Sequence, residues 1–234
     1  MFKATDVSGG YLPRSNVLRG ISLALERGSV TAMMGRNGMG KSTLMRAIAG
    51  HLPHVVGSIR LQDQELLGRP AYRVAQSGVG YVPQGREIFG DFSVEENLMM
   101  GVLGKPALPR VLPDWAWSTF PVLRERRRQR AGTMSGGQQQ QLAIMRALVG
   151  RPQLLLLDEP SEGIQPSIVM EIGATIRRIA LEQGLAVLLV EQNLELVCTM
   201  ASRCLFIENG AVVDEAETAG LSQETPVVRR YLSA

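Results

Sequence analysis

The chain has 234 residues, of which 45% are hydrophobic and 20% charged, enough to bury the core of one domain with a subdomain. Its longest apolar runs, such as Leu185–Val190, are far shorter than the roughly 20 residues that cross a bilayer, which excludes an integral membrane protein. The net charge of +3 is mild. Residues 1–6 lack the basic start and apolar stretch of a signal peptide, so we expect a cytosolic chain.

Strand and helix patterns alternate along most of the chain. Strands are expected at Val17–Leu25, Ser29–Met34, Gly57–Leu61, Val79–Val82, Gln153–Leu157, Ala186–Val190 and Cys204–Glu208. Helices are expected at Lys41–Gly50, Val94–Val102, Gln138–Val149, Pro166–Gln183 and Leu194–Ala201. This alternation predicts an α/β fold with a largely parallel sheet that helices cover on both faces.

The pattern changes between Gln84 and Arg151. Strand signals vanish there, short helical pieces appear, and prolines cluster at Pro106, Pro109, Pro113 and Pro121. We therefore predict a single domain over residues 1–234. Its core would consist of residues 1–84 and 152–234, and residues 85–151 would form an inserted helical subdomain.

A glycine-rich loop, Gly-Arg-Asn-Gly-Met-Gly-Lys-Ser-Thr, joins the strand that ends at Met34 to the helix that starts at Lys41. Its glycines allow backbone N–H groups to point at phosphates, Lys41 supplies positive charge, and the Ser42 hydroxyl suits Mg²⁺. The alternative is a glycine turn without a ligand. The strand before and the helix after favour a phosphate-binding loop with these contact residues: Gly35, Arg36, Asn37, Gly38, Gly40, Lys41, Ser42 and Thr43.

Two carboxylates follow the apolar strand that contains Leu154–Leu157. Asp158, at the exit of that strand, would face the same crevice as Ser42 and hold Mg²⁺ through water. Glu159 would act as the general base that polarises the attacking water. The alternative is a buried strand with two solvated acids at its end, but the phosphate-binding loop upstream favours the catalytic interpretation.

A second anion-binding pattern, Ser-Gly-Gly-Gln, opens the helix expected at Gln138–Val149. One nucleotide needs only one phosphate-binding loop, so two such loops far apart in the chain suggest that two molecules share each nucleotide. In this order, the motifs resemble those of the ABC ATPases. In that family the loop formed here by Ser135, Gly136, Gly137 and Gln138 closes over the ATP of a partner subunit.

The resemblance implies roles for three further residues and an N-terminal antiparallel β region. Tyr11, before the first antiparallel strand, would stack on adenine; a packed surface tyrosine is the alternative. Gln84 would reach Mg²⁺ or the attacking water, although an isolated glutamine is usually an exposed loop residue. Gln192 occupies the position of the family's switch histidine, where it can donate a hydrogen bond to the γ-phosphate but carries no positive charge.

Within that family, several stretches are similar to the importers of branched-chain amino acids and of urea or short amides, and Gln84 with Gly163–Pro166 is closer to the urea and amide members. The resemblance implies a second ATPase subunit, two transmembrane permease subunits and a periplasmic solute-binding protein. The chain would lie at the cytoplasmic face of a bacterial inner membrane. Branched-chain amino acid import is the alternative; a soluble ABC ATPase without a transport role and a nucleotide switch that scarcely hydrolyses are further alternatives.

Two other departures from the family pattern stand out. Met134 replaces the usual leucine before Ser-Gly-Gly, a volume-conserving change, and Glu162-Gly163-Ile164 replaces Ala-Leu-Asp in the D-loop, which removes a carboxylate from its usual position.

The basic run Arg124–Arg130 is interpreted as a solvated helix face, or else as a contact with a partner or acidic lipid. A role in binding nucleic acid is disfavoured because no aromatic residue interleaves with the arginines. Trp115 and Trp117 are expected to pack the subdomain. The thiols Cys198 and Cys204 are expected to be reduced and packed.

Overall fold

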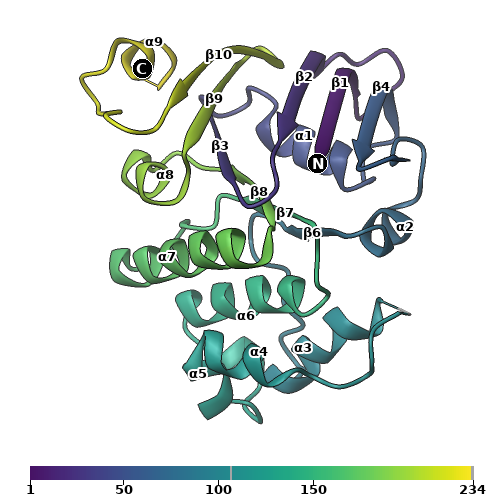
Figure 1. Cartoon of the computed structure of the whole chain (residues 1–234), viewed down its shortest axis with the longest axis vertical. Coiled ribbons are helices and arrows are strands. Elements are labelled where there is room, and N and C mark those ends of the chain that lie inside the picture. The colour runs from purple at the N-terminus through teal and green to yellow at the C-terminus, as the bar shows by residue number, and fades with distance from the viewer. Residues whose placement is uncertain (106, 233–234) are drawn as a thin grey trace.

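The computed structural model describes residues 1–105 and 107–232. Pro106, one of the clustered prolines, and the last two residues of the predicted core lie outside the described residues. Two β-sheets occupy one part of the molecule and a group of helices the other (Figure 1).

Ten strands in the described chain form the two sheets. The four-stranded sheet has the order β2-β1-β4-β5, and its neighbouring strands are antiparallel. The six-stranded sheet has the order β10-β9-β3-β8-β7-β6, and only its β10–β9 pair is antiparallel. The strands are β1 Phe2–Gly10, β2 Leu18–Leu25, β3 Val30–Met34, β4 His54–Leu61, β5 Gln64–Glu65, β6 Val79–Val82, β7 Leu154–Asp158, β8 Ala186–Val190, β9 Arg203–Glu208 and β10 Ala211–Glu217.

Nine α-helices and one 3-10 turn are described: α1 Lys41–Ile48, α2 Ala71–Gln76, α3 Val94–Leu103, α4 Asp114–Thr119, α5 Pro121–Glu125, η1 Ala131–Thr133, α6 Gly136–Leu148, α7 Pro166–Gln183, α8 Leu194–Met200 and α9 Pro226–Leu232. The predicted α/β fold, with a largely parallel sheet and an N-terminal antiparallel β region, is confirmed. Each predicted strand and helix is present, with ends shifted by at most three residues.

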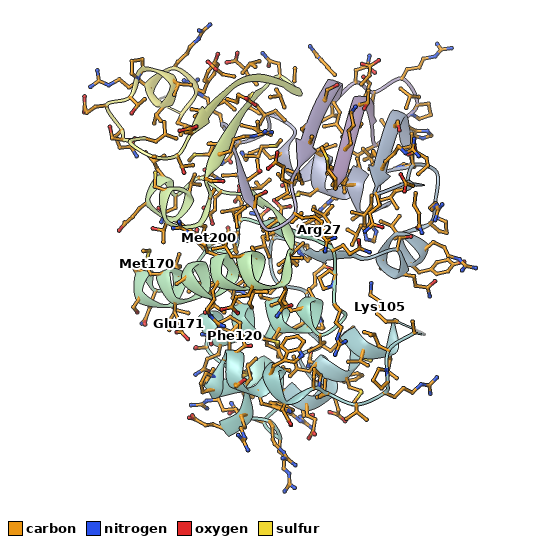
Figure 2. The ribbon with its side chains drawn as sticks, viewed as in Figure 1. Arg27, Lys105, Phe120, Met170, Glu171 and Met200 are labelled. Atoms are coloured by element: carbon orange, nitrogen blue, oxygen red, sulfur yellow. The ribbon has the colours of Figure 1, made fainter. Side chains whose placement is uncertain are left out.

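Strand β7, an interior strand next to β6, shows how the large sheet is buried on both faces. Its five residues are all buried, and alternate leucines belong to different clusters. Leu154 and Leu156 pack with α1 and the four-stranded sheet, whereas Leu155 and Leu157 pack with α7 and the helices between β6 and β7. Helix α1 therefore lies between the two sheets, with α2 packed on the same side, and helices α3–α9 pack into the cluster on the opposite face (Figures 1 and 2).

Strand β1 was not predicted, and the expected position of Tyr11 is corrected accordingly. Tyr11 follows β1, which is the first antiparallel strand, and precedes β2. The alternation along β1 is interrupted: its register with β2 shifts between Ala4 and Val7 and again before Gly9, and Asp6 has a positive φ of 49°. A β-bulge of this kind breaks the two-residue period that identifies a strand from sequence.

The basic run is not a helix face. Helix α5 ends at Glu125, so only Arg124 of the run's arginines is helical, and Arg126–Arg130 continue through turns. Arg124 and Arg126–Arg128 are exposed. The expectation for Trp115 and Trp117 is confirmed, since both are partly buried against the core that contains the helices between β6 and β7.

Candidate phosphate-binding and hydrolytic site

The glycine-rich loop leaves the carboxyl end of β3 and enters α1. Gly38 and Gly40 have φ values of 80° and 104°, a left-handed conformation that residues with a Cβ rarely adopt. The Lys41 side chain is only 4% exposed, and its Nζ donates to the carbonyl oxygens of Gly35 at 2.7 Å and Arg36 at 2.9 Å. Burial lowers the pKa of Lys41, an effect that Glu159 and Asp158 oppose. The Lys41 side chain is thus fixed by carbonyl groups of the same glycine-rich loop.

Asp158 and Ser42 are in contact although 116 positions separate them in the sequence. The Ser42 Oγ donates to Asp158 Oδ1 at 3.1 Å, and Tyr81 Oη donates to Asp158 Oδ2 at 3.4 Å. Asp158 is 2% exposed, and its burial raises the pKa of the carboxyl above the usual value, while the Ser42 hydrogen bond opposes that rise. A hydroxyl and a carboxylate side by side provide the hard oxygen ligands that fit Mg²⁺.

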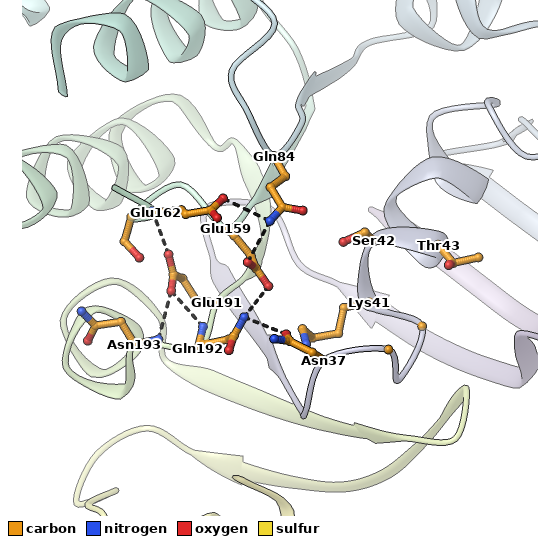
Figure 3. A pocket seen from close by; sticks show the side chains of 13 residues that line it. Asn37, Lys41, Ser42, Thr43, Gln84, Glu159, Glu162, Glu191, Gln192 and Asn193 are labelled. Carbon is orange, nitrogen blue, oxygen red and sulfur yellow. Dashed lines mark hydrogen bonds between the residues drawn. The ribbon is translucent and has the colours of Figure 1, made fainter. Parts of the chain in front are cut away.

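Glu159 lies between two side-chain amides (Figure 3). Gln192 Nε2 donates to Glu159 Oε1 at 2.7 Å, and Gln84 Nε2 lies 3.4 Å from Glu159 Oε2. Gln192 Nε2 also donates to Asn37 Oδ1 at 3.0 Å, which connects the carboxylate to the phosphate-binding loop. The Glu159 backbone is left-handed, with φ of 49°, and its N–H donates to Val190 O at 2.9 Å. The carboxylate is therefore directed from the sheet edge toward the loop.

One cavity of about 730 Å³, open to solvent, is lined by Lys41, Ser42, Gln84, Glu159 and Gln192, but not by Asp158 or Tyr11. Predicted residues on its wall are Asn37, Gly38, Gly40, Lys41, Ser42, Thr43, Gln84, Glu159 and Gln192. Of the described residues on this wall, none belongs to the Ser135–Gln138 loop. That loop instead forms a capping box at the start of α6: Ser135 Oγ accepts from Gln138 N at 3.4 Å, and Gln138 Oε1 accepts from Ser135 N at 3.2 Å.

Tyr11 lies beside the start of α1. Its Oη is 3.4 Å from Thr43 Oγ1 and accepts a hydrogen bond from Arg46 Nη1 at 3.4 Å. The side chain is 43% exposed next to the phosphate-binding loop, and the guanidinium carbon of Arg46 lies over its ring, 5.9 Å from the ring centroid.

Sequence reasoning missed three contributors to this site. Glu162 Oε2 accepts from Gln84 Nε2 at 3.1 Å, so Gln84 is shared between two carboxylates. Arg86 Nη2 donates to Glu162 O at 3.0 Å, which joins the loop after β6 to the loop after β7. Glu191 is 1% exposed and accepts three backbone N–H groups. An acidic residue directly after a wholly apolar strand was the available signal for Glu191.

Comparisons with known proteins agree with this geometry. The ABC transporter family model matches residues 18–162, which include the phosphate-binding loop, the Ser-Gly-Gly-Gln loop and both carboxylates. A relative from Pseudomonas aeruginosa, the high-affinity branched-chain amino acid transport ATP-binding protein BraG, is 40% identical over 97% of this chain and 97% of its own. The chain belongs to the ABC transporter family. It is an ABC ATPase, which binds ATP and hydrolyses it for transport.

Other similarities extend over nearly the whole ABC ATPase. The P. aeruginosa protein BraF, also named a high-affinity branched-chain amino acid transport ATP-binding protein, is 30% identical over 96% of this chain and 93% of its own. The structure of a nucleotide-free ATP-binding cassette from an ABC transporter has a TM-score of 0.81 and 22% identity, covering 97% of this chain and 96% of that one. A dimeric cassette bound to ADP and phosphate has a TM-score of 0.83 and 20% identity, covering 94% and 100%. These structures support the fold.

Within residues 1–105 and 107–232, no helix of the ABC ATPase is both long enough and apolar enough to cross a bilayer.

Proposed function

We propose that this ABC ATPase powers an importer of branched-chain amino acids. The position of Glu159 is the main support for ATP hydrolysis. Its carboxylate lies between the Gln84 and Gln192 amides, in the cavity that Lys41 and Ser42 also line. The 40% identity to BraG over nearly the full length of both chains supports the solute class.

In the proposed mechanism, Lys41 and the N–H groups of the loop bind the phosphates, and Tyr11 stacks on the adenine. Ser42 and Asp158 are the residues that would hold Mg²⁺, with Gln84 beside them; the ion, when bound, offsets phosphate charge during transfer. Glu159 accepts the proton of the attacking water on its carboxylate. Gln192 orients Glu159 by donating through Nε2, and we propose that its other N–H, which donates to Asn37 in this structure, contacts the γ-phosphate when ATP is bound.

The proposal includes a two-subunit arrangement. Because Ser135–Gln138 lie outside the cavity of their own chain, we propose that this loop contacts the ATP bound by a second ATPase subunit. BraG and BraF are two related ATP-binding proteins of one organism, which supports a partner related to this chain rather than an identical copy. Residues 85–151 would form the inserted helical subdomain, and residues 1–84 with 152–234 the nucleotide-binding core.

An import function requires partners beyond the second ATPase subunit. We propose two transmembrane permease subunits, a periplasmic solute-binding protein, and a peripheral position at the cytoplasmic face of a bacterial inner membrane. A cavity of about 550 Å³ between the sheet and α3, lined by Tyr81, Phe89, Met100 and Arg146, offers a mixed apolar and cationic surface for a permease.

The comparisons favour branched-chain amino acids over the urea or short amides first expected. That expectation rested on Gln84, which lines the nucleotide cavity, and on Gly163–Pro166, which directly follow Glu162 of the same wall, so this pattern belongs to the ATPase site and not to a solute site. The relatives BraG and BraF are both named for branched-chain amino acids.

The test is affinity capture of the tagged chain from its own membranes, followed by reconstitution of the captured complex in vesicles. We expect two multi-span subunits, a related ATPase and a binding protein, and ATP-dependent uptake of radiolabelled leucine or valine. Uptake of urea or acetamide instead would reverse the solute assignment. Recovery of soluble partners alone would overturn the importer proposal.

A further inference from the structure

Glu191 is a buried acidic residue that the proposed chemistry does not use. It follows β8 directly and is 1% exposed. Its Oε1 accepts the Ser161 N–H at 2.9 Å, and its Oε2 accepts the N–H groups of Gln192 at 2.8 Å and Asn193 at 3.0 Å (Figure 3). One carboxylate thus receives three backbone donors from two loops.

These bonds tie together the loops that leave neighbouring parallel strands. Ser161 belongs to the loop after β7, two residues beyond Glu159, and Gln192 belongs to the loop after β8. The Asn193 side chain accepts the Leu196 N–H at 3.1 Å and caps α8, so the backbone around Gln192 is fixed on both sides. Backbone restraint of this kind limits where the Gln192 amide can reach.

An ionised carboxylate suits this position better than the other polar side chains of similar length. It only accepts hydrogen bonds, and its two oxygens have room for several donors. Burying such a charge is unfavourable unless donors surround it, and hydrogen bonds to a charged acceptor are stronger than neutral ones. A glutamine would leave at least one of the three N–H groups facing an NH₂ group.

We propose that Glu191 is a positioning residue for ATP hydrolysis, since its carboxylate joins the loops of Ser161 and Gln192 and thereby holds the Gln192 amide on Glu159. This inference rests on the proposed roles of Glu159 and Gln192. Glu191 itself acts through backbone groups, so ATP binding by the phosphate loop does not depend on it.

The first test compares Glu191→Gln and Glu191→Asp with Glu195→Gln in the purified full-length ATPase. Glu195 is an exposed residue of the first turn of α8, so its variant matches the change in charge. We expect Glu191→Gln to lower kcat at least about tenfold with KM for ATP within about twofold, because the Gln192 amide loses its position on Glu159 while the phosphate-binding loop is unchanged. Glu195→Gln should retain kcat.

Glu191→Asp tests the hydrogen bond to the Ser161 loop separately from those to the Gln192 loop. It also provides a second variant if Glu191→Gln does not fold. The shorter side chain can still accept the nearby Asn193 N–H, as aspartates do in local turns, but it cannot span to Ser161 as well. We expect a folded protein, with a Tm close to that of the Glu195→Gln control, whose kcat is lowered. A kcat equal to that of the control in both Glu191 variants would overturn the inference.

The second test combines Glu191→Gln with Gln192→Ala. If Glu191 acts through Gln192, adding Glu191→Gln to Gln192→Ala causes almost no further loss of kcat. Losses that multiply would show independent action and overturn the inference, while a reduced kcat in Gln192→Ala leaves the proposed function intact. A normal kcat in Gln192→Ala would reject the proposed role of Gln192 and the Glu191 inference with it, and the ATPase assignment would remain.

Discussion

The side-chain amide of Gln192 donates to the carboxylate of Glu159 at 2.7 Å, across the ends of two neighbouring parallel strands. The same amide contacts Asn37 in the phosphate-binding loop. A neutral amide can orient the carboxylate by donating a hydrogen bond, and unlike a histidine it has no titrating proton of its own to exchange with water. This arrangement agrees with the proposal that Glu159 is the group that accepts the proton.

Glu159→Gln should retain ATP binding and lose hydrolysis. The amide fills the same space but cannot accept a proton from water, and general base catalysis contributes about 10²- to 10⁴-fold. We expect phosphate release to fall by that factor while radiolabelled ATP stays bound to the protein after gel filtration.

The matched control for that variant is Glu162→Gln. Glu162 also accepts from Gln84 and also lines the cavity, but it lies three residues further along the loop. Its variant should keep hydrolysis within a few-fold of the unmodified protein. Near-normal phosphate release by Glu159→Gln would contradict the general-base role.

Asp158→Asn should stabilise the nucleotide-free protein and abolish Mg²⁺-dependent hydrolysis. Burial raises the pKa of Asp158, so its contribution to stability is present below the unfolded value near 3.8 and lost as pH rises through the folded pKa. Removing the charge should raise Tm at pH 7, by about 2–4 °C per kcal/mol gained. Calorimetry should show this gain shrink as the pH falls toward 3.8. An unchanged or lower Tm at pH 7 would show that the hydrogen bonds from Ser42 and Tyr81 already offset the cost of burying the Asp158 charge.

Tyr11→Ala should weaken ATP binding more than Tyr11→Phe. The phenylalanine keeps the ring face and loses only the contacts of the hydroxyl with Thr43 and Arg46, which are both long at 3.4 Å. Loss of aromatic stacking corresponds to about 1 kcal/mol, or roughly a five-fold change in Kd. Fluorescent ATP titration measures both variants. Equal Kd values for Tyr11→Ala and the unmodified protein would remove the stacking role.

Gly210→Ala should destabilise the fold more than Gly68→Ala. Both glycines are left-handed, with φ of 79° and 77°, so both variants carry the same backbone penalty. A Cβ on Gly210 would collide with the carbonyl oxygen of Val17, whereas Gly68 has open space around it. The collision should add about 1–3 kcal/mol, measured as a difference in urea midpoint. Equal midpoints would mean that the β9–β10 turn moves freely away from β2.

The sequence predicted the elements whose pattern is continuous. Strands β6 and β8 and helix α7 have the predicted ends, since uniform apolar runs and a proline at the helix start define them. Helix α6 begins two residues earlier than predicted because the Ser135 capping box draws both glycines into its first turn. The bulged β1 was missed because its spacing is irregular.

The candidate site was predictable wherever one short motif supplies the chemistry. The glycine-rich loop, Asp158 and Glu159 fall into that class, and the structure brings them around one cavity or, for Asp158, directly behind it against Ser42. The sequence marks Glu191 only as an acid that follows an apolar strand. Its hydrogen-bonding role could not be predicted, because its three donors come from two loops whose approach depends on the pairing of β7 with β8. Long-range hydrogen bonds to backbone groups of this kind produce no recognisable residue spacing in the sequence.

The alternation of leucines in β7 also bears on how this protein could be recombined with relatives. The helices between β6 and β7 share one packed interior with Leu155 and Leu157, while the nucleotide loop's helix packs on Leu154 and Leu156. A chimera that exchanged those helices would leave the α1 side untouched but would have to match side-chain volumes against α7 and the leucines of a strand that was not exchanged. Successful grafts would therefore carry compensating substitutions at alternate positions of β7.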